Sequence, residues 1–244
     1  MDKKVEELSR VKEIGFMGKV AASLSHEIKN TLAIINESAG LMGDLLRKDA
    51  PKDWPPYSRL TNLLASIEEQ IQRSADIVKR LNQFAHSMDK SLVDLDLNEL
   101  VRQITTLARR FARLRGVQLE VEAAPEALLI NSDPFRVQYV VFGFIERALW
   151  RCSPNQTKVT LACSPSGDMA QVIVKDQGSP EGDWLREQIA AALSPTGRSP
   201  GEKDPELSIL ALTMAELGGS VEIEEVGKTG NKVILSFPPK MPDR

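Results

Sequence analysis

The spacing of apolar residues predicts two long helices at the start of the chain. Over residues 5–47 they recur at intervals of three, four or seven, which is typical of a coiled-coil seam. This seam comprises Ile14, Met17, Ala21, Leu24, Ile28, Ile35 and Met42. A second seam over residues 58–89 comprises Leu60, Leu64, Ile67, Ile71, Ser74, Val78, Leu81, Ala85 and Met88. Three prolines within residues 51–56 separate the two, so we expect an antiparallel hairpin that dimerises into a four-helix bundle.

After Lys90 the pattern changes to alternating short helices and strands. Asp96 and Asp133 are suitable N-caps for helices that reach about Leu114 and Trp150. Further helices are predicted over 183–193 and 205–217, and strands over 117–121, 127–130, 158–163, 170–175, 220–225 and 232–237. The predicted fold class is therefore α+β, with a helical-hairpin domain at 1–91 and an α/β sandwich at 92–244.

Composition excludes several classes of protein. With 42% hydrophobic and 27% charged residues, the 244-residue chain has a globular balance, and its net charge of −3 gives no sign of a nucleic-acid partner. The longest apolar run, 139–145, falls far short of the ~20 residues that a membrane span needs. The charged N-terminus lacks the apolar core of a signal peptide. Cys152 and Cys163 show no metal-ligand spacing, so we expect two free thiols in a reducing cytoplasm.

The chain has only two histidines, and His26 lies within the predicted first helix, in the stretch Ser23–Asn30. If Leu24 and Ile28 face the seam, His26 and Asn30 share an outward face at i, i+4. An exposed imidazole there can act as a nucleophile, the adjacent Glu27 can orient the ring or accept its proton, and Asn30 can position a water or a phosphoryl oxygen. From spacing alone, a solvated histidine on the helix surface is the more common explanation.

The stretch Ser-Leu-Ser-His-Glu-Ile-Lys-Asn at 23–30, followed by Thr-Leu-Ala-Ile-Ile, resembles the H-box of two-component sensor histidine kinases. The order of hairpin and sandwich is also similar to that family. Thr31 stands where the family usually has proline, so the helix is expected to continue without a kink.

The resemblance implies phosphorylation of His26, assisted by Glu27, with Asn30 helping a water attack an aspartyl phosphate. It also implies that the neighbouring Ser25, Lys29 and Thr31 contact the receiver domain of a response regulator, which supplies its own Mg²⁺.

The segments that resemble the family's ATP site depart from its pattern. Phe142 and Glu146 occupy two asparagine positions, and Pro180 replaces a glycine of the loop that retains Asp176 and Gly178. Two further glycines align with Asp204 and Glu206, whose carboxylates would repel a triphosphate. We therefore expect Asp176, Gly178 and Glu146 to be vestigial, with neither ATP nor a metal ion bound by this chain.

Four functions stay open at this stage. The favoured one is a dimeric histidine phosphotransferase without kinase activity of its own, which exchanges a phosphoryl group between response regulators. The alternatives are a sensor kinase with an unusual ATP site, a response-regulator phosphatase that uses Glu27 and Asn30, and a non-catalytic scaffold. Residues 1–16 are long enough only for a helical lead-in, so the input signal is expected from a partner protein or from other parts of a longer chain.

Overall fold

A computed structural model describes residues 3–47, 57–86, 92–153, 158–180, 182–194, 204–225 and 230–242. Contacts between residues divide the chain into two compact units. The hairpin unit is Gly18–His86, and the sandwich unit combines Met1–Met17 with Ser87–Arg244. The predicted hairpin domain comprised residues 1–91, whereas here residues 1–17 group with the second half of the chain. The reason is that the first turns of α1 pack with the sandwich unit.

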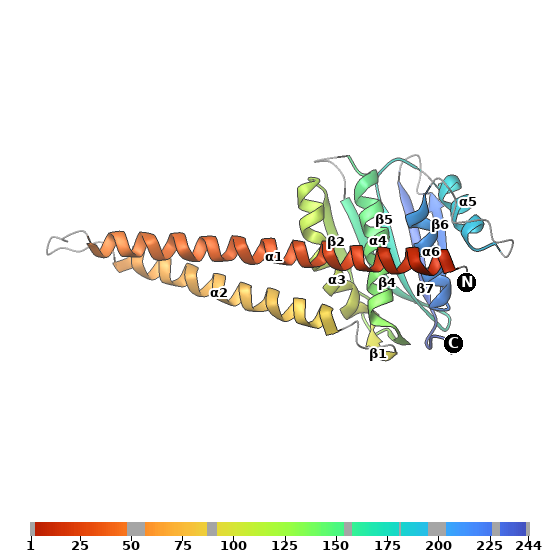
Figure 1. The fold of residues 1–244 in the computed structure, drawn as a ribbon, viewed down its shortest axis with the longest axis horizontal. Coiled ribbons are helices and arrows are strands. Elements are labelled where there is room, and N and C mark those ends of the chain that lie inside the picture. The colour runs from red at the N-terminus through yellow and green to blue at the C-terminus, as the bar shows by residue number, and fades with distance from the viewer. Residues whose placement is uncertain are drawn as a thin grey trace. The chain divides into compact units, whose positions relative to one another are not determined.

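The hairpin unit contains most of α1 (Lys3–Arg47) and all of α2 (Tyr57–His86), as Figure 1 shows. Helix α1 is continuous through Thr31, which confirms that replacing the family's proline leaves the helix intact. The proline-rich connection lies outside the described residues, as do the side chains of Ala85 and Met88.

The predicted seams are correct only in part. Leu24 is buried and Ile28 and Ile35 are half-buried as expected, but Val20 is buried in place of Ala21. Ile14 is 60% exposed. On α2 the inner positions are Gln70, Ile77 and Phe84 together with the half-buried Leu60, Leu63, Ile67, Ser74 and Leu81. The predicted seam residues Leu64, Ile71 and Val78 are exposed in the single chain, by 46%, 54% and 45%, and do not contact α1 as the inner positions do.

Polar side chains link the two helices inside the hairpin. The hydroxyls of Thr31 and Ser74 are 2.6 Å apart. One of the two hydroxyls donates to the other, and the accepting hydroxyl can then donate to a carbonyl of its own helix, Thr31 Oγ1 to Ile28 over 2.9 Å or Ser74 Oγ to Gln70 over 2.8 Å. Because a buried hydroxyl without a partner is costly, this pairing fixes the register of α1 against α2 at this level.

The sandwich unit is built on a five-stranded sheet with the order β2-β4-β5-β7-β6. Its strands are β2 (Gln118–Glu122), β4 (Lys158–Ser166), β5 (Met169–Asp176), β7 (Asn231–Phe237) and β6 (Ser220–Glu225). Only the β2–β4 pair is parallel. Burial alternates along β5, so one face of the sheet is packed and the other faces solvent.

Four helices accompany the sheet: α3 (Leu97–Leu114), α4 (Pro134–Arg151), α5 (Gly182–Ala192) and α6 (Pro205–Glu216). The predicted N-caps are confirmed, since Asp96 accepts from the Asn98 amide and Asp133 from the Arg136 amide. Within the described residues, no helix is both long enough and apolar enough to cross a membrane.

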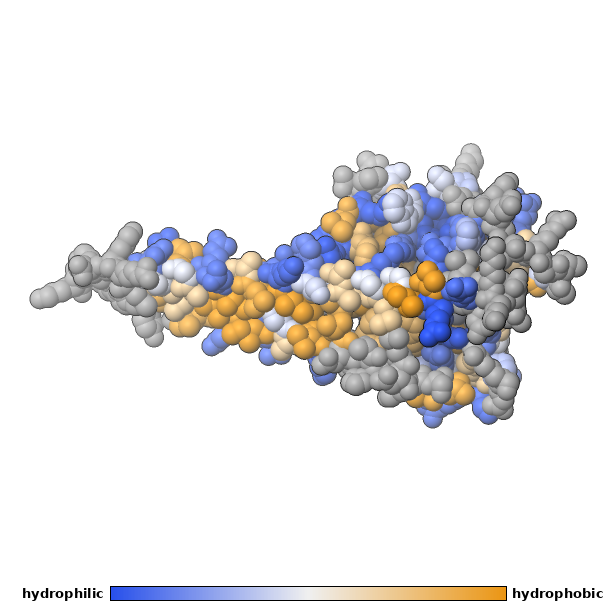
Figure 2. All heavy atoms as spheres, viewed as in Figure 1, coloured by the Kyte–Doolittle hydropathy of each residue, from blue (hydrophilic) through white to orange (hydrophobic). Residues whose placement is uncertain are grey.

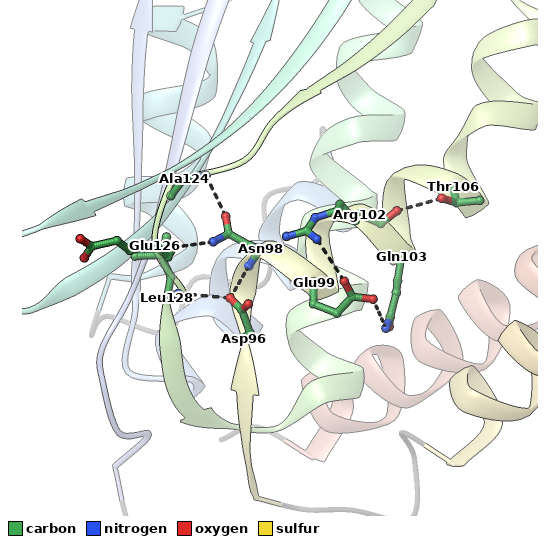
Figure 3. Close-up of polar contacts among 9 residues, drawn as sticks. All are labelled: Asp96, Asn98, Glu99, Arg102, Gln103, Thr106, Ala124, Glu126 and Leu128. Atoms are coloured by element: carbon green, nitrogen blue, oxygen red, sulfur yellow. Dashed lines mark hydrogen bonds and ion pairs between the residues drawn. The ribbon is translucent and has the colours of Figure 1, made fainter.

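A second, two-stranded sheet pairs β1 (Val93–Asp96) with β3 (Leu129–Ser132), and β1 was not predicted. At its end lies a set of hydrogen bonds made by Asp96 and Asn98, called the polar bracket below (Figure 3). Asp96 Oδ1 accepts from the amides of Asn98 and Leu128, while the Asn98 side chain donates to the Glu126 carbonyl and accepts from the Ala124 amide. The bracket thereby fixes the β2–β3 loop to the start of α3.

The N-terminal turns of α1 complete the core of the sandwich unit. Phe16 is buried against three aromatic rings of α4, with ring centroids 5.8 Å from Phe135, 5.7 Å from Tyr139 and 5.0 Å from Phe142. Residues 135, 139 and 142 lie on one face of a helix, which explains how one side chain contacts all three. Glu13 adds an ion pair of 3.8 Å with Arg136.

Candidate functional site

His26 lies in the hairpin unit on the face of α1 that points away from α2. Its side chain and that of Asn30 are exposed, Glu27 is half-buried, and Leu24 is buried on the opposite face. The predicted orientation is therefore confirmed: His26 and Asn30 stand one helical turn apart on an accessible surface. A nucleophilic imidazole and a hydrogen-bonding amide can both be reached there by a large partner.

The three residues predicted to contact a partner separate into two groups. Ser25 and Lys29 are exposed on the same side of α1 as His26. Thr31 is only 2% exposed, and its hydroxyl pairs with that of Ser74. The assignment of Thr31 to a partner surface is therefore corrected, because the residue that replaces the family's proline turns into the hairpin and holds the two helices together.

In the sandwich unit, Asp176 lies at the end of β5 and is completely surrounded by donors. Arg151 donates from Nε over 3.1 Å and from Nη2 over 2.5 Å, Asn231 Nδ2 donates over 3.1 Å, and the Gly178 amide donates over 3.0 Å. The side chains of Arg151 and Asp176 are 5% and 0% exposed. A carboxylate with these partners has no capacity left for a ligand.

Gly178 closes the same place sterically. A Cβ at this position would lie 2.6 Å from backbone and Cβ atoms of Arg151 at the end of α4. The loop after β5 therefore packs directly on α4, and Asn231 reinforces it with a second bond, from Nδ2 to the Ser179 carbonyl over 3.0 Å. Neither Arg151 nor Asn231 was predicted as a partner of Asp176, because both lie far from it along the chain.

The middle of α4 is likewise filled by the protein. Phe142, at one of the two aligned asparagine positions, is 3% exposed and contacts Phe16 and Phe111 with ring centroids 5.0 and 5.4 Å away. Gly143 allows α6 to approach, since a Cβ there would lie 2.6 Å from Leu210. Glu146, at the second aligned position, is half-buried.

Asp204 has a local role that explains its presence. It caps α6 by accepting from the Leu207 amide over 2.9 Å, and its other oxygen pairs with Arg147 Nη2 over 2.6 Å. Pro205 occupies the first turn of α6, where a missing N–H costs nothing. The helix terminus at which an anion would bind is thus already capped and neutralised by side chains of the sandwich unit.

Three carboxylates act on the phenol of Tyr139 on α4. Burial, the largest cause, raises the pKa of the Tyr139 phenol well above its ordinary value, and the nearby carboxylates of Glu206, Glu13 and Glu146 raise it further. The same carboxylates disfavour a triphosphate. Within the described ranges, no group of three or more His, Cys, Asp or Glu side chains is arranged to hold a metal ion.

Three features separate these segments from the family's ATP-site pattern. The Asp176 carboxylate is fully hydrogen-bonded within the protein, a phenylalanine replaces an asparagine on α4, and the N-terminus of α6 is capped by Asp204. In contrast, the His26 surface keeps each side chain that its predicted chemistry requires.

Comparison with known proteins finds similarity to sensor proteins and to histidine kinases. No model of a protein family matches the chain. Among curated proteins, it is 28% identical over 175 residues to the sensor protein FixL of Bradyrhizobium diazoefficiens, covering 71% of this chain and 34% of FixL. It is 23% identical over 221 residues to the sensor protein DegM of a Bacillus species, covering 91% of this chain and 54% of DegM. The chain thus spans about a third and about half of these two relatives.

Solved structures show the same fold. The catalytic domain of the histidine kinase ThkA covers 63% of this chain and all of that domain, with a TM-score of 0.53 and 23% identity. ThkA solved in complex with the response regulator protein TrrA covers 97% of this chain and 66% of ThkA, with a TM-score of 0.50 and 21% identity.

Both the helical hairpin and the sandwich therefore have the architecture of a histidine kinase. The curated relatives named above are sensor proteins, and the solved structures with this fold are histidine kinases, so the comparisons support a relationship to the two-component histidine kinase family.

Proposed function

We propose that this chain is a kinase-derived histidine phosphotransferase that exchanges a phosphoryl group between His26 and the receiver aspartates of response regulators, without binding ATP itself. One contrast carries the proposal: His26 and Asn30 are exposed together, whereas Asp176 is saturated by Arg151, Asn231 and Gly178.

The proposed step needs only groups on the exposed face of α1 and on the partner. An unprotonated ring nitrogen of His26 attacks the phosphorus of an aspartyl phosphate in line. The P–N bond forms as the P–O bond to the carboxylate breaks, and the carboxylate leaves with the bonding electrons. The second ring nitrogen keeps its hydrogen, which Glu27 can accept as a hydrogen bond. The reverse reaction passes the phosphoryl group to another receiver.

The partner class follows from the site and from one neighbour. The exposed Ser25 and Lys29 flank His26, and a lysine can pair with the carboxylates and phosphoryl oxygens of a receiver. ThkA, which has the same fold over nearly the whole of this chain, was solved in complex with a response regulator. Mg²⁺ for the transfer would be held by the receiver.

We further propose that the hairpin forms a homodimer. Leu64, Ile71 and Val78 are exposed at exact seven-residue intervals on α2, and Ile34 and Leu41 repeat the interval on α1. Figure 2 shows apolar surface extending along the hairpin. Such stripes are characteristic of seams that a second pair of helices covers.

The transfer is tested with a panel of purified receiver domains, each phosphorylated with radiolabelled acetyl phosphate and then mixed with this chain. We expect label on the wild type and on His86→Ala, which removes the only other histidine, but none on His26→Ala. Label that persists on His26→Ala, or a panel in which no receiver labels the wild type, would contradict the proposal.

Incubation with radiolabelled Mg·ATP tests whether the chain lacks kinase activity of its own. We expect no label on His26, and labelling that is lost in His26→Ala would establish an active kinase instead. Asn30→Ala separates the remaining alternative: a phosphatase loses its release of inorganic phosphate in this variant, whereas phosphoryl exchange through His26 persists.

Sedimentation analysis tests the dimer. Ile71→Asp places a charge in the proposed seam and should convert a dimer into a monomer, whereas Gln72→Asp, at the exposed neighbouring position, should not. A wild-type monomer at micromolar concentration would contradict the dimer and leave the transfer chemistry to be judged separately.

A further inference from the structure

The ends of α3 and α4 lie together in the sandwich unit and carry two large apolar side chains that the fold leaves in solvent (Figure 1). Leu114 at the end of α3 is 73% exposed, and Trp150 at the end of α4 is 67% exposed. Arg115 connects the two ends, because its guanidinium lies 3.2 Å from the centroid of the Trp150 ring and donates to the Leu149 carbonyl over 3.4 Å. Leu114, Arg115 and Trp150 therefore mark one surface, called the α3–α4 tip below.

Positive charge is concentrated at this tip. Residues 109–115 contain four arginines, whereas no Asp or Glu occurs between positions 100 and 119. Arg109 and Arg113 are exposed on α3. In the part of the chain that the structure describes, no carboxylate pairs with Arg109 or Arg115. The tip is thus strongly basic on a chain whose net charge is −3, so it favours an anionic partner.

The apolar side chains of the tip decide what kind of anionic partner fits. Single exposed apolar residues need no explanation, but two beside a cluster of arginines indicate a binding surface. Side chains that are exposed by two thirds or more project from the surface, and a folded partner would need a matching pocket for them. The headgroup region of a bilayer needs no such pocket. It favours tryptophan, accepts leucine below the phosphates and offers those phosphates to guanidinium groups.

We propose that the α3–α4 tip docks on anionic phospholipid bilayers, with Leu114 and Trp150 inserted among the headgroups and Arg109, Arg113 and Arg115 in contact with lipid phosphates. The contact is peripheral and uses side chains of the sandwich unit alone, so it does not depend on the chemistry at His26. Two inserted side chains bury less apolar area than one acyl chain, and the docking is therefore weak and reversible.

Sedimentation of the full chain with lipid vesicles tests the docking. One set of vesicles contains equal parts of phosphatidylcholine and phosphatidylglycerol, and the other contains phosphatidylcholine alone. Wild type is compared with Trp150→Ala and Arg109→Gln, which each remove one exposed side chain of the tip. Urea unfolding of each variant should match that of wild type, because neither side chain belongs to the core.

The chain supplies a matched control for each substitution. Leu129→Ala removes an apolar side chain that is 69% exposed, on the strand that precedes the opposite end of α4. Arg102→Gln removes an exposed arginine two turns before Arg109 on the same helix, where it is paired with Glu99 over 3.3 Å.

We expect wild type to bind the anionic vesicles and not those of phosphatidylcholine alone, with an affinity that falls as salt is added. Trp150→Ala should weaken the binding by roughly tenfold or more, because apolar area leaves the bilayer. Arg109→Gln should weaken it by roughly fivefold, through the loss of one charge near the lipid surface. Leu129→Ala and Arg102→Gln should each change it less than about twofold.

Trp150→Phe provides a readout that a merely electrostatic contact would not give. Phenylalanine can still insert, so this variant should keep most of the binding. Brominated phosphatidylcholine included in the anionic vesicles should quench part of the tryptophan fluorescence of wild type, and this quenching should be absent in Trp150→Phe.

Three results would each overturn the proposal. Wild type could fail to bind the anionic vesicles, or bind phosphatidylcholine alone equally well. Binding could be weakened by Arg109→Gln but not by Trp150→Ala, which would indicate a general affinity for polyanions such as nucleic acid or an acidic protein. Finally, Leu129→Ala could weaken binding as much as Trp150→Ala, which would move the contact away from the tip.

Discussion

His26 and Asp176 are the two residues to which the family resemblance assigns the central chemistry, and their surroundings are opposite. His26 stands on the outer face of α1, with Asn30 exposed one turn away. Asp176 is 4% exposed and accepts hydrogen bonds from Arg151, Asn231 and Gly178. One region of the molecule leaves its polar groups available to a partner, and the other pairs them with its own side chains.

In the sandwich unit, the residues aligned with the family's ATP site make contacts within the protein. A ligand that used Asp176 would first have to break its buried ion pair with Arg151, and each charge-assisted hydrogen bond is worth ~1.5–3 kcal/mol. The sandwich unit therefore keeps the polar groups of this region in internal pairs. The exposed face of the hairpin, in contrast, makes no internal use of His26.

The largest effect is expected from removing Arg151, which pairs with Asp176. Arg151→Met leaves the buried Asp176 carboxylate without its cation, so we expect a loss of about 3–5 kcal/mol in the free energy of unfolding, measured with urea. Arg102→Met, which removes an exposed pair with Glu99, should cost less than ~1 kcal/mol. An Arg151→Met protein that is as stable as wild type and binds Mg·ATP would show that Arg151 only obstructs a nucleotide site and does not stabilise the fold.

The next largest effect is expected at the first turns of α1. Phe16→Ala removes a buried ring from the cluster on α4 and should destabilise the sandwich unit by ~3 kcal/mol. Hydrogen exchange should accelerate in residues 134–151 and remain unchanged in residues 57–86. Ile14→Ala, on the same helix but 60% exposed, is the control and should have little effect. Equal acceleration in both ranges would show that Phe16 supports the hairpin as well.

A smaller effect is expected inside the hairpin. Thr31→Val keeps the shape of the side chain but removes its hydrogen bond to Ser74, so we expect a loss of ~1 kcal/mol and faster exchange in residues 57–86. Thr106→Val removes a hydroxyl that bonds only to a carbonyl of its own helix and should be nearly neutral. A Thr31→Val protein as stable as wild type would mean that the polar link does not fix the hairpin.

The last effect is confined to alkaline pH and concerns the sandwich unit. Burial, and after it the Asp96 carboxylate, raises the pKa of Cys163 from 9.0 to about 11. The unfolded thiol ionises first, so this contribution to stability is complete below pH 9 and is lost as pH rises towards 11. Cys163→Ala should flatten that part of the stability profile, while Cys152→Ala keeps it. Parallel profiles for wild type and Cys163→Ala would contradict the assignment.

Local chemistry made much of the fold predictable. Asp96 and Asp133 are capping residues whose effect acts within one helical turn, and both cap the helices that the sequence indicated. The outward orientation of His26 followed from the apolar period around Leu24 and Ile28. These features depend on neighbours within a few residues, which is the range that a sequence pattern reports.

The features that were not predicted depend on contacts between segments far apart in the sequence. A 3.5-residue period allows more than one stripe on a helix, and the inner stripe of α2 passes through Gln70 and Ile77 because Ser74 meets Thr31. Strand β1 has only four residues and exists through its pairing with β3. The pairing of Arg151 with Asp176 joins a helix end to a strand end, and nothing in either segment signals it.

The position of Phe16 also bears on the order in which the molecule is made. Its partners on α4 leave the ribosome about 120 residues after it, which at ~5–20 residues per second is a delay of ~6–24 s. During that interval the two helices of the hairpin can already pair through contacts of shorter range. The first turns of α1 therefore wait, with an unpaired aromatic side chain available to chaperones, until α4 has been synthesised.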